Sequence, residues 1–133
     1  MSETTVGIIK PDAFRHRGEI LEMIKRAGLV VKLAEERNLL SIQAGDFYKE
    51  HEGKPFYIQL INFMTSGPVV ILLIEGVNAI QGWRKLMGST NPKEAAHGTI
   101  RKSFGTSIER NAVHGSDSPD SAIRETSILF PQN

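Results

Sequence analysis

The sequence contains no cysteine, and this absence removes several kinds of chemistry at once. Disulfide bridges, thiolate nucleophiles and zinc sites built on cysteine ligands are all excluded. A strong excess of one charge is also absent, because 16 lysines and arginines face 15 aspartates and glutamates. A net charge of +1 gives no overall field that would attract the protein to nucleic acid or to a membrane surface. Any basic surface that binds a ligand must therefore be local.

Long apolar runs are missing as well. The longest, Val69–Ile74, has the length of a buried strand and is far too short to span a membrane. The first residues do not show the charged-then-apolar pattern of a signal peptide, so we expect a cytoplasmic location and no membrane partner. With 133 residues, the chain is expected to form a single domain, 1–133, that is large enough for a real core.

Several common nucleotide and catalytic motifs are absent too. The sequence has no P-loop, no dinucleotide-binding glycine pattern after a strand and no G-x-S-x-G nucleophile elbow. Its four histidines do not have H-E-x-x-H spacing. We therefore expect no metal site built from protein ligands.

Apolar periodicity and turn signals predict alternating strands and helices. Strands are expected at Thr5–Ile9, Leu29–Leu40, Val69–Glu75 and, at the end of a buried strand, Ala112–Val113. Helices are expected at Glu19–Ala27, from a Ser41 cap through His51, at Pro55–Met64, from an Asn78 cap to Met87, and from Ser118 to Glu125. One helical turn is expected at Asn91–Glu94, a loop after Arg101, and a separate apolar tag at Ile128–Phe130.

This order of elements contains no repeat and no internal linker. It favours an α/β domain (an α+β sandwich) of the ferredoxin-like kind, in which helices pack on a four-stranded antiparallel sheet. A parallel doubly wound sheet is the alternative, because the second strand follows the first helix too closely to decide between the two.

The segment Asn111–Asp117 is the strongest candidate for a functional site. It sets His114 between small apolar residues and a Gly-Ser-Asp turn, where Gly115 permits a sharp bend. A histidine there is held by rigid backbone and can point into a cleft. Taken alone, such a histidine is more often a satisfied core or surface residue than a reactive one.

Scattered cations suggest which chemistry this histidine could perform. A neutral imidazole is a competent nucleophile near pH 7, and arginine and lysine neutralise the charge of a transferred phosphoryl group. The candidate cations are Lys10, Arg84, Arg101 and Arg110. Glu125 could orient the imidazole. The competing interpretation is a solvated strand end for the lysine and surface ion pairs for the other groups.

Eight short motifs, in the same order along the chain, resemble those of nucleoside diphosphate kinases. The stretch Asn111–Asp117 is similar to the family signature N-x-x-H-G-S-D around the phosphorylated histidine. The other matching segments are Ile9–Asp12, Gly53–Phe56 after Tyr48, Ser66–Val69, Glu75–Gly76, Arg84–Gly88 with Thr90–Pro92, Gly98–Arg101 and Ala122–Glu125. The resemblance covers nearly the whole chain.

The resemblance implies a ping-pong reaction. The γ-phosphoryl group of a nucleoside triphosphate, typically ATP, would pass to His114 and then to a nucleoside diphosphate. Arg84, Thr90 and Arg101 would hold the phosphates. Lys10 and Asn111 would bond to the sugar hydroxyls, with Lys10 also near the phosphate.

It also implies how the base and the histidine are held. Phe56 would stack on one face of the base, with Leu60 and Ile108 opposite. If apolar side chains contact only the flat faces of the base, its hydrogen-bonding edges are not recognised, so broad base specificity is expected. Tyr48, Ser116 and Glu125 would surround and support the histidine.

The resemblance further implies Mg²⁺ as the cofactor, carried mainly by the nucleotide phosphates without a protein metal cage. It implies a homo-oligomer, a tetramer or hexamer built from dimers. The sequence departs from the family pattern in three places: a shortened connection from Lys10 to Gly18, His97 in place of a proline, and Lys102–Ser103 in place of Gly-Asp. The last two lie in the loop that, in the family, helps form subunit contacts as well as the nucleotide cleft. We expect them to affect oligomeric state and stability rather than the chemistry.

Two other functions are alternatives to nucleotide phosphorylation. A ferredoxin-like binding module for small effectors or single-stranded nucleic acid would need a basic face with aromatic residues on the sheet. The net charge and the aromatic residues, which are expected on helices, make a nucleic-acid partner the weaker hypothesis. A phosphohistidine carrier would pass phosphate to a protein, but the matches at Lys10, Phe56 and Asn111 favour a nucleotide acceptor.

Overall fold

Four antiparallel strands form one sheet in the computed structural model, which describes residues 2–130. The strand order is β2-β3-β1-β4, with β1 (Glu3–Ile9) and β3 (Val69–Gly76) in the centre. The edges are β2 (Val30–Arg37) and β4 (Val113–Gly115). Every neighbouring pair is antiparallel. The ferredoxin-like prediction is therefore confirmed, and the parallel doubly wound alternative is excluded.

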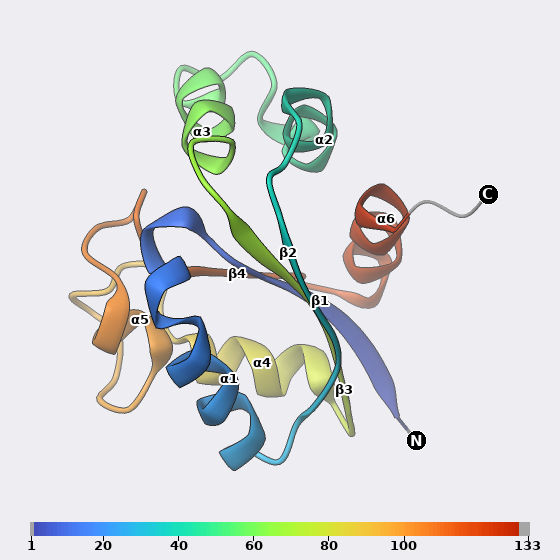
Figure 1. The fold of residues 1–133 in the computed structure, drawn as a ribbon, viewed down its shortest axis with the longest axis vertical. Coiled ribbons are helices and arrows are strands. Elements are labelled where there is room, and N and C mark those ends of the chain that lie inside the picture. Colours follow the sequence, from blue (N-terminus) through green and yellow to red (C-terminus); the bar gives the residue numbers. More distant parts are fainter. Residues whose placement is uncertain (1, 131–133) are drawn as a thin grey trace.

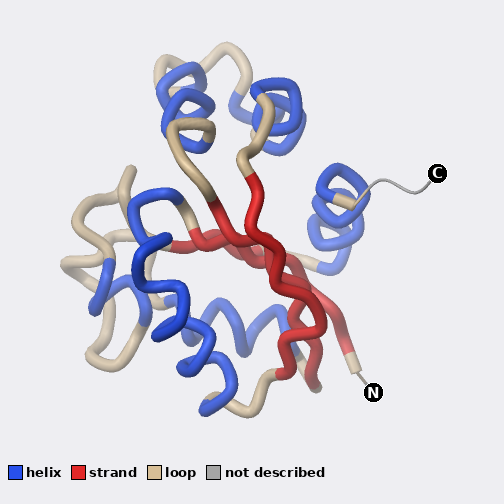
Figure 2. The backbone as a smooth tube through the Cα atoms, in the orientation of Figure 1, coloured by secondary structure: helices blue, strands red, loops and turns tan. Residues whose placement is uncertain are grey.

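Helices cover both faces of the sheet (Figures 1 and 2). One face carries α1 (Arg17–Arg26), α4 (Ala79–Met87) and α5 (Ile100–Phe104). The other carries α2 (Ser41–Phe47), α3 (Tyr57–Met64) and α6 (Pro119–Leu129). Two 3₁₀ segments, η1 (Pro11–His16) and η2 (Lys49–His51), precede α1 and follow α2.

Each face of the sheet has its own hydrophobic core, as the alternation of side chains along a strand requires. In β1, Ile9 belongs to the core under α1 and α4, whereas Val6 and Ile8 belong to the core under α2, α3 and α6. The histidine strand β4 pairs only with β1, so both the opening and the closing strands of the chain meet at this edge.

Three expected segments differ from the structure because local periodicity was a poor guide there. Residues expected as a loop after Arg101 form α5, which is only five residues long. The apolar tag at Ile128–Phe130 is not separate, since α6 continues to Leu129 and buries that side chain in the second core. The segment between the first expected strand and the first expected helix is also helical, because η1 (Pro11–His16) leads directly into α1 (Arg17–Arg26).

The observed ends of β2 and α2 also differ from those predicted from the sequence. β2 ends at Arg37 and α2 at Phe47, so Tyr48 is the C-cap of the helix and His51 ends the 3₁₀ segment η2 that follows. Ser41 is the first helical residue rather than the cap, and the Gln43 side chain accepts a hydrogen bond from the Leu40 N–H at 3.0 Å. The expected cap position of Asn78 before α4 is confirmed.

Two findings bear on possible partners. Within residues 2–130, no helix is both long enough and apolar enough to cross a bilayer. None of the strands in that range carries a Phe, Tyr or Trp, so the sheet lacks the aromatic platform with which ferredoxin-like domains stack nucleic-acid bases.

Candidate active site

His114 lies in the short edge strand β4, opposite Ile8 of β1. A tight turn precedes the strand, because the Val113 N–H donates to the Asn111 carbonyl at 2.9 Å and Ala112 has φ 75°. This conformation is unusual for a residue with a Cβ, so the prediction of Ala112 as a strand residue is wrong. Two contacts hold the turn: the Ala112 N–H donates to Asp12 Oδ2 at 3.1 Å, and the Lys10 N–H donates to the Ala112 carbonyl at 2.8 Å.

The imidazole is oriented by a carboxylate from α6. His114 Nε2 lies 3.0 Å from Glu125 Oε1, which also accepts a hydrogen bond of 2.7 Å from the Ser116 hydroxyl. Ser116 and Glu125 are buried, and the Phe47 ring packs edge-on to the imidazole at 4.7 Å. Burial lowers the pKa of His114 below its usual value, although the Glu125 carboxylate partly opposes the shift. Since a carboxylate can only accept hydrogen bonds, a neutral imidazole at this position donates from Nε2 and keeps its lone pair on Nδ1.

Lys10 is buried beside the histidine strand rather than solvated at a strand end. Its Nζ donates to Asn111 Oδ1 at 2.8 Å, and Asn111 Nδ2 donates to the Thr90 carbonyl at 3.1 Å. Burial, together with the charge of Arg101, lowers the pKa of Lys10 to about 8. The amine therefore carries a charge that is poorly compensated at neutral pH and would gain from an anionic ligand.

Arg101 is buried as well, and its guanidinium donates to two backbone carbonyls instead of pairing with a surface carboxylate. Its guanidinium donates to the Gly88 and Val113 carbonyls at 2.9 Å each, while Nε is buried without a partner. Burial and the nearby Arg84 lower the pKa of Arg101 to about 10. Neither arginine has a carboxylate within ion-pair distance in residues 2–130, so the surface ion-pair interpretation fails for both.

Two cavities of about 630 and 650 Å³ meet at the histidine. Both are lined by Thr90, Arg101 and His114. The first, called here the polar cavity, adds Lys49, Glu50, Arg84, Met87, Gly88, Ser89, Gly115, Asp117, Ser121, Arg124 and Glu125. The second, called the aromatic cavity, adds Lys10, Tyr48, His51, Phe56, Gln59, Leu60, Phe63, Ile108, Glu109, Arg110 and Asn111.

All the site residues predicted from the sequence line one of these cavities except Ser116, which is buried behind the histidine. In the aromatic cavity, the Phe56 and Ile108 side chains are 44% and 56% exposed. Their apolar surfaces are therefore accessible to a flat ligand. The Tyr48 hydroxyl is buried without a partner, and burial raises its pKa. A neutral imidazole with cations on one side and apolar faces on the other suits a ligand that is anionic at one end and aromatic at the other.

Sequence reasoning missed several lining residues. His51 packs against the Phe56 ring at 5.2 Å, and its place beside Tyr48 was obscured by its assignment to a helix. Glu50 and Asp117 bring two carboxylates to the polar cavity. Asp117 stands inside the His114 segment and Lys49 and Glu50 directly follow Tyr48, so proximity in sequence to recognised residues could have indicated them.

Comparison with known proteins gives consistent results. A sequence model of the nucleoside diphosphate kinase family matches residues 3–133. A nucleoside diphosphate kinase of Syntrophotalea carbinolica is 52% identical over 130 residues, which cover 96% of this chain and 95% of that one.

Solved structures agree with this match. The Aquifex aeolicus nucleoside diphosphate kinase superposes with a TM-score of 0.93 at 39% identity, covering 98% of this chain and 96% of the other. The Halobacterium salinarum enzyme, determined in complex with CDP, has a TM-score of 0.93 at 35% identity and covers 99% and 90%.

Proposed function

The chain belongs to the nucleoside diphosphate kinase family and has that activity, and from this premise we propose that His114 carries the phosphoryl group between the two nucleotides. The observation that supports this role best is the bond from His114 Nε2 to the buried Glu125 carboxylate. It leaves the Nδ1 lone pair free to attack the γ-phosphorus. The P–O bond to the diphosphate breaks as the N–P bond forms, and the second half-reaction reverses these changes with a different diphosphate.

The cations next to the histidine would stabilise the transferred group. Arg84, Arg101 and Thr90 line the polar cavity at His114, and Lys10 approaches from the aromatic cavity. The transition state spreads charge over three equatorial oxygens, which fixed donors stabilise without reorganising. Lys10 and Asn111, bonded to each other at 2.8 Å, would turn toward the sugar hydroxyls and the phosphate.

The aromatic cavity would hold the nucleoside. Phe56 offers an exposed ring for one face of the base, and Leu60 and Ile108 offer apolar contacts for the other. Tyr48 forms part of the wall near His114. Because stacking on a face does not read the hydrogen-bonding edge of a base, purines and pyrimidines would both be accepted.

Mg²⁺ fits this site as a companion of the nucleotide. Residues 2–130 contain no cluster of three or more His, Asp or Glu that could hold a metal by themselves. Glu50 and Asp117 do line the polar cavity, and Mg²⁺ typically combines one or two carboxylates with waters and substrate phosphates. When bound, the ion would neutralise phosphate charge during transfer.

We also propose a homo-oligomer built from dimers. β2 is an edge strand of eight residues, and its apolar side chains Val30 and Leu33 are 53% and 37% exposed. An open edge of this kind pairs readily with another chain. Charged substitution of both residues should lower the mass measured by sedimentation. A cytoplasmic location stays a prediction, which cell fractionation tests.

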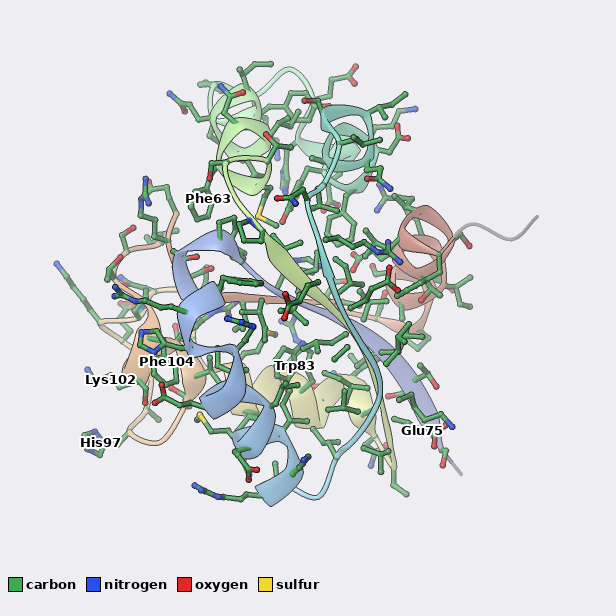
Figure 3. The ribbon with its side chains drawn as sticks, viewed as in Figure 1. Phe63, Glu75, Trp83, His97, Lys102 and Phe104 are labelled. Atoms are coloured by element: carbon green, nitrogen blue, oxygen red, sulfur yellow. The ribbon has the colours of Figure 1, made fainter. Side chains whose placement is uncertain are left out.

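Two of the departures from the family pattern, at His97 and at Lys102–Ser103, lie just before or within α5 and concern the same assembly. His97 and Lys102 project outward at the periphery, away from the sheet (Figure 3), and they line neither cavity, nor does Ser103. We expect them to alter contacts between subunits and to leave the chemistry unchanged.

A single-turnover experiment tests the role of His114. The protein is incubated with γ-labelled ATP and Mg²⁺, freed of nucleotide, and then given GDP or CDP alone. Acid-labile label should appear on the protein and leave as GTP or CTP. His114→Ala should remove the label while the fold survives, and His97→Ala, an exposed histidine outside both cavities, should retain it. Normal labelling of the His114→Ala protein would refute the assignment.

A further inference from the structure

The only tryptophan in the sequence lies directly beneath the histidine strand. Trp83 of α4, labelled in Figure 3, is fully buried, and its indole lies against Gly7 of β1 and Gly115 of β4. The seam between the two strands is flat at this point because Gly7 and Gly115 lie opposite each other. A Cβ would come within 2.9 Å of the indole nitrogen at Gly7 and within 2.6 Å at Gly115. The indole therefore fits only because both positions are glycine.

The indole is also bonded to the histidine itself. Trp83 Nε1 donates to the His114 carbonyl at 3.1 Å, a normal hydrogen-bond distance. Between β1 and β4, the Lys10 N–H donates to the Ala112 carbonyl and the Ser116 N–H donates to the Val6 carbonyl. In an antiparallel pair every second residue pair is hydrogen-bonded, so the pair between these two, Ile8 and His114, is hydrogen-bonded as well. The His114 carbonyl therefore points toward β1. The indole N–H thus adds a second donor to a carbonyl that already lies in the ladder.

His114 is held from both faces of β4: its imidazole is contacted on one face and its backbone carbonyl on the other. On one face the imidazole contacts Phe47 and Glu125, both on the side of the α2–α6 core. On the other face, Trp83 belongs to the core under α1 and α4, and it donates a hydrogen bond to the backbone carbonyl of His114. This matters because β4 has only three residues and one neighbouring strand, so the ladder alone fixes it weakly.

We infer that Trp83 is a positioning residue for phosphoryl transfer, which keeps the His114 backbone in the place from which Nδ1 attacks. The inference rests on the proposed role of His114. A small displacement of a reacting group lowers the rate without changing the affinity for a substrate that is bound by other residues. Trp83 contacts neither cavity, so it should affect the rate of transfer and leave nucleotide binding unchanged.

Trp83→Phe tests this inference, because it keeps a buried aromatic ring and removes the N–H. The rate at which ATP phosphorylates the protein in a single turnover should fall about two- to tenfold, as expected for one hydrogen bond, with ADP affinity unchanged. Tyr57→Phe is the matched control, since it removes another aromatic side-chain bond to a carbonyl, from Tyr57 to Gly45 at 3.2 Å. A wild-type rate in Trp83→Phe, or an equal loss in Tyr57→Phe, would overturn the inference.

If Trp83→Phe does not fold, the inference can still be tested with a second variant, Gly7→Ala, and with the NMR signal of the indole N–H in the wild type. Gly7→Ala keeps the tryptophan but pushes its indole away, and should slow phosphorylation similarly. In the wild type, the single indole N–H resonance should shift when His114 is phosphorylated. A normal rate in Gly7→Ala with a displaced indole resonance, or no shift on phosphorylation, would contradict the inference. Absence of label on wild-type His114 would instead refute the role of the histidine, so the two can fail separately.

Discussion

Replacing Glu125 by glutamine tests the orientation of the imidazole most sharply. The substitution keeps the shape of the side chain, and its amide oxygen can still accept from His114 Nε2 at the observed 3.0 Å. Only the charge is lost. A hydrogen bond to a charged group is worth about 1.5–3 kcal/mol, whereas a neutral one is worth about 0.5–1.5 kcal/mol, so the substitution loses about 1–1.5 kcal/mol. Since about 1.4 kcal/mol corresponds to a tenfold change in rate, the plateau rate of phosphorylation by ATP should fall roughly five- to tenfold.

The pH profile should move in a direction that a merely structural defect would not produce. Protonated imidazole cannot attack, so the rate rises with pH through the pKa of His114. In the wild type burial lowers this pKa and the Glu125 charge opposes the shift. Without that charge the pKa falls further. The acid limb of the rate should therefore move to lower pH in Glu125→Gln, while the plateau drops.

Ser116→Ala is the control for this experiment. It removes the 2.7 Å bond to Glu125 but leaves the carboxylate beside the imidazole. Its plateau should fall less, and its acid limb should not move to lower pH. The assay is rapid-quench phosphorylation with labelled ATP between pH 5 and 8. An unchanged plateau in Glu125→Gln, or an acid limb displaced to higher pH, would refute the reasoning.

Three other predictions follow from single contacts. ADP affinity measured by calorimetry should fall as pH rises through about 8, because the Lys10 pKa of about 8 marks the loss of its charge, and this dependence should vanish in Lys10→Met. Phe56→Ala should remove about 1–3 kcal/mol of stacking and raise KM for GDP and CDP by similar factors; a change confined to one base would contradict face-only recognition. Gly115→Ala should lower the free energy of unfolding by about 1–3 kcal/mol, because its Cβ would lie 2.6 Å from Trp83 and Met87 atoms; an unchanged thermal midpoint would show that the seam can relax.

Local signals in the sequence were sufficient for most of the fold and for the identity of the site. Alternation and apolar runs identified the strands, and helical spacing with caps identified α1, α3, α4 and the start of α6. These signals work because each reflects which face of one element is buried. They failed at α5, whose five residues are too few to establish a period, and at Ala112, whose left-handed conformation is imposed by contacts with Lys10 and Asp12.

The sequence by itself determined the elements and the order in which reactive residues occur; the tertiary structure alone decided which of them meet and how deeply they are buried. Lys10 and Asn111 are 101 residues apart and lie 2.8 Å from each other because β1 and β4 are neighbours in the sheet. The lowered pKa values of Lys10 and His114 arise from burial, which depends on every element packed around them. The bond from Trp83 to the His114 carbonyl joins α4 to β4 across the face of the sheet. No pattern in the sequence indicates such a contact, since it depends on how the helix is docked.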